Sequence, residues 1–465
     1  MKMIIEAHWV DDGGQTERVQ LASINRDLTT DPLGLSLAEG KALLAATQKY
    51  FVEQQCQSIA FAHAYCERCE AKLSLKGRHE RQIRTVFGTV QVQSPRVRYC
   101  RCSGKAAGAS FSPLIQLVPT CMTPELEYLQ VKWAAHLPYA AATRLLCEIL
   151  PVSDAISVSS TKRRVRAVGA TLDQSFGQPA NTANEQLASG VPPALTALAV
   201  DSGWLKHCDP PRRQGRHVNL VVGRACFEGG NTRLYAYVHN QVPSAAARLD
   251  QFLSASGVRS DERVTVVTDG AGEFQKAVNG ASWPVCRIMD WFHIAMKFRA
   301  IEQTARKYPE MVAPNGRGLN EEVASCKWLV WHGKAAKAVR RLKSIHDALE
   351  EIPVLQDSAL YWNLRHAWWY LRSNDRYLVN YGRRHHKGLP ISSAIAESAV
   401  NEVVSLRMAK KRQMRWTDEG AHLLAQVRVH ELNGELRPRV VPFPWRTSKP
   451  PPSAPWDGYQ MLMAA

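Results

Sequence analysis

The spacing of hydrophobic and polar positions divides this chain into segments of three kinds. Residues 83–93 alternate in polarity on both sides of Gly88, which predicts two short strands joined by a tight turn. Residues 123–175 and 294–390 repeat their apolar positions at helical spacing, and both are predicted to be helical throughout. From residue 194, short runs of β-branched residues alternate with helical segments, and this alternation predicts an α/β fold.

The α/β part has a definite order of predicted elements. Three strands joined by short turns are predicted to be antiparallel, and a helix and two strand–helix units follow them. The order βββαβαβα is the ribonuclease-H-like arrangement, here with an all-helical insertion at about residues 300–390. The strands are predicted at residues 195–201, 218–224, 232–238, 264–267 and 285–289, and the first helix at residues 244–255. In the helical insertion, the aromatic residues expected in the core are Trp328, Trp331, Trp368 and Trp369.

Composition separates the chain into six predicted parts. The first 60 residues carry a strand at residues 3–10, a polar loop and a helix at about residues 36–57. The tail is rich in proline and has no periodicity, so we expect it to be extended or disordered. The parts are an N-terminal helical segment (1–60), a zinc-ribbon-like domain (61–115), a helical DNA-binding domain (120–175), a linker (176–193), a ribonuclease-H-like catalytic domain (194–436) and the tail (437–465).

Two of the predicted strands lead into an aspartate. Asp201 ends the first strand and Asp269 ends the fourth, at the edge where open α/β sheets place their chemistry. An Asp-Gly pair by itself often only opens a turn, but the same ending on a second strand favours a paired site. Glu397, on a predicted helix at about residues 393–410, would complete a group of three carboxylates. The alternative for Glu397 is a surface carboxylate of that helix.

Carboxylate oxygens are hard ligands that favour Mg²⁺ or Mn²⁺. Two such ions about 4 Å apart can activate a water or a 3′-hydroxyl and stabilise the leaving oxygen in phosphoryl transfer. We therefore expect two ions per active site, with Asp201 bridging them and Asp269 and Glu397 each holding one.

Four cysteines flank the predicted hairpin. Thiolates bind zinc tetrahedrally, and paired cysteines on two short hairpins are typical of a zinc ribbon. His63 or His79 could replace one ligand, and the alternative for the whole group is four reduced cysteines without a metal. The predicted zinc ligands are Cys66 and Cys69, which form a CxxC, and Cys100 and Cys102, which form a tighter CxC.

The charge of the chain indicates an anionic partner. Its net charge is +17 and its pI is near 9.5, which makes nucleic acid the first choice. Two predicted helices, at residues 139–150 and from residue 159, are joined by a short turn and resemble a helix-turn-helix, although such helix pairs also occur without DNA. The second helix opens with the predicted DNA-binding residues Lys162, Arg163, Arg164 and Arg166.

The sequence carries no signal that predicts a membrane or secreted protein. It has no run of about 18 apolar residues, and its N-terminus lacks a signal-peptide core. We therefore expect a cytoplasmic protein without a membrane partner, whose 11 cysteines are reduced.

Six motifs together resemble the DDE transposases of the ISKra type, bacterial insertion-sequence enzymes related to the Mutator-like superfamily. The resemblance spans about residues 35–430, because the cysteine region and the hairpin around Gly88 also match the family's N-terminal half. The motifs are Ala199-Val-Asp201-Ser-Gly, Thr268-Asp269-Gly-Ala, Asp290-Trp-Phe-His293, Lys327-Trp-Leu-Val-Trp-His-Gly333, Glu397-Ser-Ala-Val-Asn401 and Arg415-Trp-Thr-Asp-Glu-Gly-Ala421.

The resemblance implies a catalytic triad of Asp201, Asp269 and Glu397, with Asp290 and His293 close to it. His293 would contact the scissile phosphate or orient a strand; its alternative is a satisfied core histidine that caps a helix. The implied protein is a nucleoid-associated transposase that binds terminal inverted repeats and cuts and joins 3′ ends. Two DNA ends must be paired, which implies a homodimer or a larger assembly on DNA.

A basic run follows Glu397 and ends at Trp416, which the resemblance places near the active site. It suits the phosphates of transposon ends, while a solvated helix face is the ordinary alternative. The run contains Arg407, Lys410, Lys411, Arg412 and Arg415.

Two other functions fit the same sequence. The first is a sequence-specific DNA-binding protein with an inactive nuclease-like domain, which the three intact carboxylates argue against. The second is a metal-dependent nuclease that cuts DNA without joining it, which strand-transfer products would distinguish from a transposase. A catalytic zinc site is disfavoured, because His293 has no paired His or Cys at ligand spacing.

Overall fold

The computed structural model of the chain describes residues 1–10, 14, 16–27, 30–31, 33–66, 68–176, 194–208, 217–270, 272–408 and 414–438. The predicted linker from residue 177, the tail from residue 439 and the basic residues Lys410, Lys411 and Arg412 lie outside these residues. The chain forms two compact units, which divide between Arg164 and Val165. Among the described helices, none is both long and apolar enough to cross a bilayer.

The first unit begins with a hairpin that the sequence predicted only in part. β1 (Lys2–Val10) pairs antiparallel with β2 (Thr16–Asn25), so the polar loop expected after β1 is wrong for residues 16–25. Most side chains of β2 are exposed, and most of its residues are polar. Pairing with β1 makes it a strand, although its composition does not indicate one. α1 (Leu37–Ala62) follows. Ser36 and Glu39 form a capping box at its N-terminus, which the spacing of apolar residues does not predict.

A second hairpin confirms the two strands predicted around Gly88. β3 (Leu75–Thr85) and β4 (Gly88–Arg98) pair antiparallel, and Gly88 adopts a φ of 112°, which favours glycine at the turn. Their inward residues, with Val52 and Cys56 of α1, form a small hydrophobic core. Short elements complete this region: η1 (Arg101–Ser103), β5 (Ser110–Phe111) and α2 (Pro113–Leu117).

Three helices confirm the helical prediction for residues 123–175. They are α3 (Pro124–His136), α4 (Tyr139–Ile149) and α5 (Val158–Gln174), and α5 runs across the division between the units. Buried polar side chains tie the three together: Gln130 Nε2 donates to Thr161 Oγ1 at 2.7 Å, and Thr161 lies 3.0 Å from the hydroxyl of Thr143. This network fixes how the first turns of α5 sit on α3 and α4.

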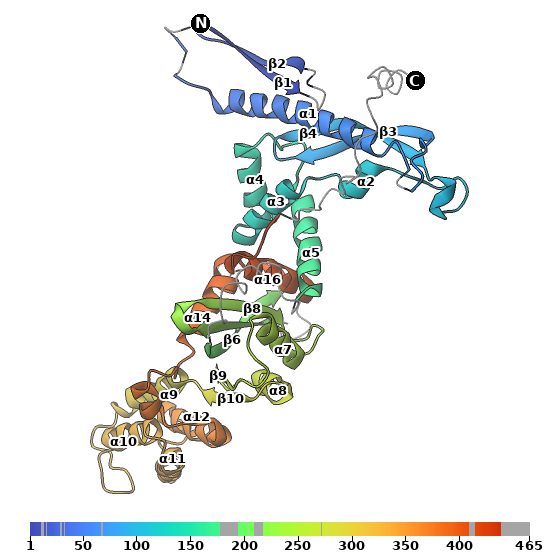
Figure 1. The fold of residues 1–465 in the computed structure, drawn as a ribbon. Helices are drawn as coiled ribbons and strands as arrows, with labels where there is room; N and C mark the ends of the chain where they lie inside the picture. The colour runs from blue at the N-terminus through green and yellow to red at the C-terminus, as the bar shows by residue number, and fades with distance from the viewer. Residues whose placement is uncertain are drawn as a thin grey trace. The chain divides into compact units, whose positions relative to one another are not determined.

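The second unit is built on a mixed sheet with the strand order β10-β9-β6-β7-β8 (Figure 1). β6, β7 and β8 are successive antiparallel neighbours, as predicted, and β9 and β10 run parallel to β6. The strands are β6 (Leu195–His207), β7 (His217–Phe227), β8 (Thr232–Val238), β9 (Val264–Thr268) and β10 (Val285–Met289), with the short β11 (Arg415–Trp416) paired to the last residues of β6.

The first strand of this sheet is longer than predicted. Asp201 was expected to end it, but β6 continues to His207, because β7 pairs with it as far as Lys206 and β11 pairs with its last residues. β9 pairs with β6 at Leu198 and Ala199. Asp201 therefore lies inside β6 but just beyond the stretch covered by β9.

Helices occupy both faces of the sheet and extend beyond the edge strand β10. Leu198 and Val200 of β6 pack with residues of the first helix after β8, whereas residues 199, 201 and 203 face the other way, toward the helix of Glu397. The helices are α7 (Ala245–Ala255), α8 (Gly272–Gly280), α9 (Trp291–Ala305), α10 (Leu319–Trp331), α11 (Ala335–Glu350), α12 (Ala359–Ser373), α13 (Tyr381–His386), α14 (Ala394–Val400), η4 (Asn401–Ser405), α15 (Leu406–Met408) and α16 (Asp418–Leu432), with short turns η2 (Glu228–Gly230) and η3 (Asp375–Tyr377).

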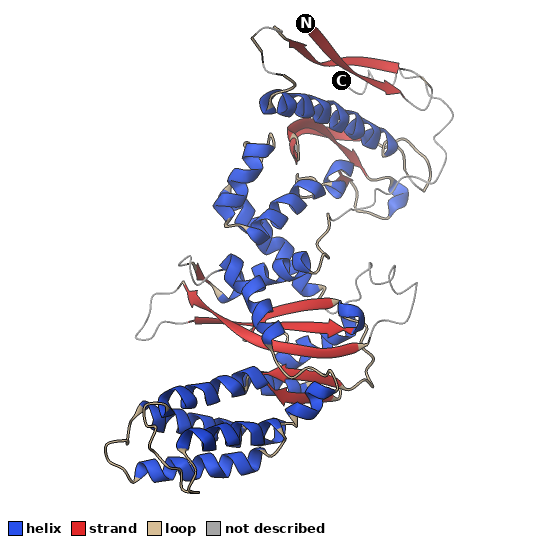
Figure 2. Ribbon diagram, turned by 90° about the vertical axis from the view of Figure 1, so that its left-hand side faces the viewer, coloured by secondary structure: helices blue, strands red, loops and turns tan. Residues whose placement is uncertain are grey.

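The helical insertion forms a bundle of α9 to α12 beside β10, with a hydrophobic core of its own (Figure 2). The prediction that its four tryptophans are core residues is wrong for two of them: Trp328 is 54% and Trp369 is 58% exposed. The core is filled instead by smaller residues such as Leu342 and Leu364, and helical spacing alone does not tell which side of an aromatic-rich helix faces inward.

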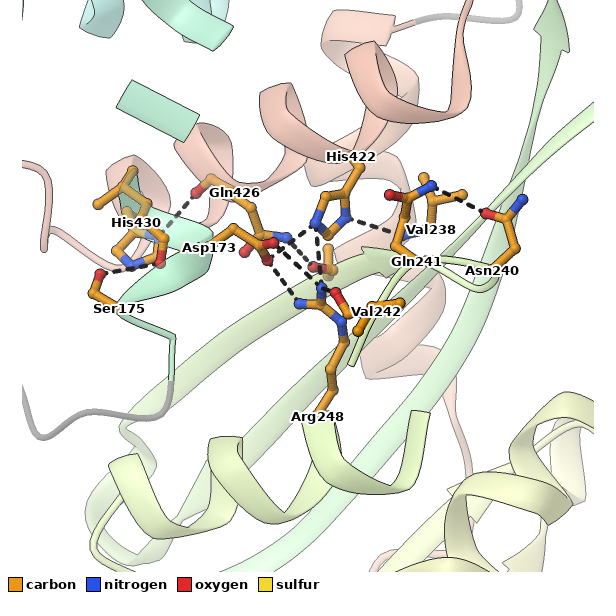
Figure 3. A network of polar contacts seen from close by, with 12 residues as sticks. Asp173, Ser175, Val238, Asn240, Gln241, Val242, Arg248, His422, Gln426 and His430 are labelled. Atoms are coloured by element: carbon orange, nitrogen blue, oxygen red, sulfur yellow. Dashed lines mark hydrogen bonds and ion pairs between the residues drawn. The ribbon is translucent and has the colours of Figure 1, made fainter. Parts of the chain in front are cut away.

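Two buried polar side chains, Arg248 and His422, bind the half-buried carboxylate of Asp173 near the C-terminal end of α5 (Figure 3). Arg248 of α7 is 1% exposed, and its guanidinium donates to Asp173 of α5 at 2.8 Å and to the carbonyl of Val242. His422 of α16 has Nε2 3.0 Å from the same carboxylate. Burial would raise the pKa of Asp173, but hydrogen bonds from His422 and Arg248 outweigh it and lower the pKa to about 2.

Removing the carboxylate should destabilise the second unit. Asp173→Ala leaves the Arg248 charge buried without its partner, and we expect a loss of about 3 kcal/mol in the free energy of unfolding, measured by urea titration at pH 7. In the wild type, the contribution of Asp173 should be complete above its ordinary pKa of 3.8 and be lost as the pH falls toward 2, since the unfolded state takes up the proton first. Asp261→Ala, which breaks an exposed pair with Arg259, is the matched control and should change little. Equal effects of the two substitutions would contradict a special role for the buried group.

Candidate active site

Asp201 and Asp269 lie at the same level on neighbouring strands. Ala199 of β6 pairs with Val267 of β9, and each aspartate lies two residues further along its own parallel chain. Asp269 follows the last residue of β9, and its carbonyl accepts a hydrogen bond of 2.6 Å from the hydroxyl of Tyr370. Gly270 then turns the chain with a φ of 101°, where a side chain would also come within 2.8 Å of Met289.

The helix of Glu397 packs closely against β6. A Cβ atom at Gly203 would lie 3.1 Å from Val404 and 3.2 Å from Val400, so glycine at this position lets the helix approach the strand. Gly203 is on the same face of β6 as Asp201. The helix continues from α14 into the π-helical turn η4, a feature that often accompanies functional sites. This packing brings the carboxylate of Glu397 to the face that carries Asp201.

The buried carboxylate of Asp290 positions His293 and the start of α14. It is 0% exposed and accepts hydrogen bonds from the backbone of Phe292 at 2.8 Å, from His293 Nδ1 at 2.6 Å and from Ser393 Oγ at 2.5 Å. Ser393 is the N-cap of α14, and its carbonyl accepts from the amide of Glu397 at 3.0 Å. Asp290 therefore joins the end of β10 and the first turn of α9 to the helix that bears Glu397.

The charges of the neighbouring acidic side chains act on Asp201 and on His293. Burial raises the pKa of Asp201, the amide of Ser202 lowers it, and the negative charges of Asp269 and Glu397 raise it further. The hydrogen bond to Asp290 raises the pKa of His293, and Asp269 and Asp201 add to that effect. Four of the predicted residues, Asp201, Asp269, His293 and Glu397, are thus close enough for their charges to influence the pKa of Asp201.

The donors fit a hard cation. All three carboxylates supply oxygen, the ligand type that Mg²⁺ and Mn²⁺ prefer. Among the described residues, however, the groups whose ligand atoms all lie within 4.8 Å of one another do not include Asp201, Asp269 and Glu397. The negative charges of both Asp269 and Glu397 act on Asp201.

Sequence reasoning missed Lys297 of α9. Its ammonium lies 4.4 Å from the centre of the Tyr370 ring, and although burial lowers its pKa, the charge of Asp269 acts in the opposite direction. Lys297 therefore faces the carboxylates from the helix that carries His293. The signal was present in the sequence, because residues 293 and 297 are four apart and share one face of a helix.

No known family model matches this chain. No curated protein matches it in sequence either. Among solved structures, the chain is similar to the Drosophila P element transposase strand transfer complex, with a TM-score of 0.32 and 12% sequence identity over 68% of this chain and 93% of that chain. A similarity of this size is no evidence of activity.

The predicted DNA-binding residues fall in different environments. Lys162 and Arg163 are exposed on α5, Arg164 pairs with Glu127 at 2.7 Å, and Arg166 pairs with Glu419 at 3.2 Å. Of the basic run after Glu397, Arg415 is exposed on β11, but Arg407 is 1% exposed and lies over the ring of Trp416. Its burial removes Arg407 from a DNA-binding surface.

Trp416 lies away from the carboxylates. It is part of β11 and is paired with His207 of β6. His207 is six residues past Asp201, a distance of about 20 Å along a strand. The ring of Trp416 is buried, and its Nε1 donates to the carbonyl of Met408. Trp416 thus supports the fold at the far end of β6.

The four predicted zinc ligands gather in the first unit. The Sγ atoms of Cys66, Cys69, Cys100 and Cys102 all lie within 4.8 Å of one another, with Cys66 and Cys102 3.3 Å apart and Cys69 and Cys100 3.4 Å apart, and none forms a disulfide. The geometry is therefore compatible with a tetrahedral zinc site of the ribbon type.

Backbone amides favour thiolates at this site. The amides of Cys69 and Arg68 lower the pKa of Cys66 to about 6, and the amide of Cys102 lowers the pKa of Cys100. The pKa of Cys102 is raised to about 12 by its hydrogen bond with Cys66 and by its other cysteine neighbours. A divalent cation would stabilise all four thiolates at once, which is the chemistry of a structural zinc site.

Zinc content tests this cluster directly. We expect the purified protein to hold a single zinc ion, and Cys66→Ser to lose it, because a site of three thiolates and a hydroxyl binds zinc far more weakly. Atomic emission on the purified proteins measures the metal. Cys208→Ser, the same change at an exposed cysteine outside the cluster, should retain it. A wild-type protein that takes up no zinc on refolding with the metal would contradict the site.

The close approach at Gly203 gives a second test. Gly203→Val should push α14 outward and move Glu397, and we expect the dissociation constant for Mn²⁺, measured by electron paramagnetic resonance, to rise about tenfold. Gly203→Ala should cause a smaller change. Gly77→Val is the control, since a Cβ at this strand position meets nothing within 4 Å. Unchanged Mn²⁺ affinity in Gly203→Val would show that Glu397 does not depend on this contact.

Proposed function

We propose that this chain is a DNA transposase of the DDE kind, which binds the terminal inverted repeats of an element and cleaves and joins 3′ ends by two-metal phosphoryl transfer. One observation carries the proposal. Three carboxylates come from separate elements, and the charges of Asp269, after β9, and of Glu397, on α14, both act on Asp201 inside β6.

The order of the sheet supports the same proposal. Three antiparallel strands followed by two parallel strands on the opposite side of β6 make the arrangement that we propose to be ribonuclease-H-like. An insertion between β10 and α14 separates the third carboxylate from the first two in sequence. This arrangement and the sequence motifs quoted above agree, although a fold by itself does not define a reaction.

Each polar residue of the site has a proposed role. Asp201, Asp269 and Glu397 would hold two Mg²⁺ or Mn²⁺ ions, which activate the attacking hydroxyl and stabilise the leaving oxygen when bound. His293, held through Nδ1 by Asp290, would present its other ring nitrogen to the DNA phosphate. Lys297 adds a second cation on the same side of the site.

The other parts of the chain fit a DNA partner. The net charge is +17, and Lys162 and Arg163 are exposed near the start of α5, the second helix of the proposed helix-turn-helix. The cysteine cluster would hold one zinc ion as a structural centre of the N-terminal unit. Joining two ends requires two active sites, so we propose that the protein acts as a homodimer or larger assembly on DNA.

Asp269→Asn should abolish cleavage while DNA binding persists. The amide keeps the shape of the side chain but removes a charge that the metal requires, and we expect cleavage to fall by roughly 10²–10³-fold. The substrate is a supercoiled plasmid that carries the gene with its native flanks, and the 3′ ends are mapped with Mg²⁺ and with EDTA. Asp261→Asn, the same change at an exposed surface pair, is the matched control and should cleave as the wild type does.

The products distinguish the proposal from its rivals. Mg²⁺-dependent nicks at both ends of an inverted repeat, followed by joining to a target, would support a transposase. Nicks without joined products would indicate a nuclease. Binding to the flanks without any cleavage by the wild type would indicate a DNA-binding protein with an inactive catalytic domain.

A further inference from the structure

A groove begins beside the candidate active site and runs along the outer face of α9. It has a volume of about 340 Å³, at the lower end of the roughly 300–1,000 Å³ found for ligand sites. Most of its lining residues lie on one face of α9, at helical spacing, and one residue comes from α10. The lining residues are Phe292, Ala295, Met296, Arg299, Glu302, Gln303, Arg306 and Lys327.

The position of the groove ties it to the site. Phe292 is the neighbour of His293 in sequence, and the two rings meet edge to face with centroids 6.0 Å apart. Asp290 binds both residues, the amide of one and the ring of the other, so the mouth of the groove and the imidazole are held by the same carboxylate. The aromatic ring at the mouth of the groove therefore lies next to the imidazole of the candidate site.

The lining changes from apolar to basic along the helix. Phe292 and Met296, near the mouth, are 43% and 46% exposed, so both offer apolar surface to a ligand. Arg299 and Arg306 follow, both exposed and separated by about 10 Å of helix axis. The one acid, Glu302, lies 3.4 Å from Lys327, which offsets its charge. The groove thus offers an apolar platform followed by a net positive channel.

We propose that this groove binds single-stranded DNA next to the scissile phosphate, with an unpaired base against Phe292 and backbone phosphates on Arg299, Arg306 and Lys327. The inference rests on the proposed function, because it takes DNA as the substrate of the site. A duplex stacks its bases on one another, so only a base outside the duplex can lay its face on an aromatic side chain. Aromatic platforms beside cations are how proteins hold single strands without reading their sequence.

Binding of labelled oligonucleotides tests the groove apart from catalysis. The full-length protein with Asp269→Asn serves as the background, so that no DNA is cleaved, and fluorescence anisotropy compares a single strand of oligo(dT) with a duplex of equal length. We expect Phe292→Ala to weaken binding of the single strand about tenfold and to leave the duplex nearly unchanged. Phe292→Trp, which keeps an aromatic face, should restore binding.

The cations have a separate signature. Arg299→Ala with Arg306→Ala should lower the slope of log affinity against log salt for the single strand by about 1.4, since each phosphate contact contributes about 0.7. The matched controls lie in the same helical insertion but outside the groove: Trp369→Ala, an exposed aromatic on α12, and Arg340→Ala, an exposed cation on α11.

The outcomes separate this inference from the proposed function. Unchanged single-strand binding in Phe292→Ala, or equal losses for the duplex and the single strand, would overturn the groove proposal even if cleavage depends on Asp269. Cleavage that survives Asp269→Asn would overturn the proposed triad, while a selective single-strand defect in Phe292→Ala would still support the groove.

Discussion

The carboxylate of Asp290 is the constraint on which the rest of the candidate site depends. It is wholly buried, and burying a charge is costly unless hydrogen bonds replace the lost water. The hydrogen bonds come from the backbone of Phe292, the ring of His293 and the hydroxyl of Ser393. To keep its partners, Asp290 must hold the start of α9 and the start of α14 together at the end of β10. The imidazole and Glu397 are positioned because one buried charge requires both helices.

This constraint also explains how a long helical insertion fits into the sheet domain. The amide of Trp291 donates to the carbonyl of Ile391 at 2.9 Å, so the chain leaves and re-enters at adjacent points. Between them, the insertion has its own hydrophobic core. Its folding need not disturb the carboxylates, yet it contributes to their surroundings: the Tyr370 hydroxyl binds the carbonyl of Asp269, and its ring receives Lys297. The insertion therefore shares its core with Met289 of β10 and contacts the candidate site through Tyr370 and Lys297.

The parts that could be predicted from the sequence are those controlled by local pattern. β9 and β10 were found within a residue because their β-branched runs are short and bounded, and α14 was found through its apolar spacing. The length of β6 could not be predicted, because its final residues are ordered by pairing with β7 and with β11, and β11 is far away in the sequence. β2 was missed because its polar composition does not indicate a strand, although the neighbouring β1 pairs with it. Whether Trp328 is exposed depends on how the helices of the insertion pack, and the spacing of apolar residues does not determine that packing.

The placement of individual side chains was less predictable than the elements that carry them. The sequence predicts Asp201, Asp269 and Glu397 as candidate site residues, because two of them follow β-branched runs and all three lie in the sequence motifs. Lys297 was missed because a lysine on an amphipathic helix ordinarily faces water, and only the packing of α12 against α9 turns it toward the site.

The four cysteines and the three carboxylates are each a cluster of like charges, and the protein offsets the negative charge differently in the two clusters. At the cysteines, backbone amides of Arg68, Cys69 and Cys102 point at sulfur, so the compensation is local and arises as soon as the loops form. At the carboxylates, the compensation comes from side-chain cations on α9, and burial together with the neighbouring charges still raises the pKa of Asp201. A local site can be recognised from a spacing of cysteines. The carboxylate site requires the sheet, the insertion and the returning helix to be in place, because its residues come from all three.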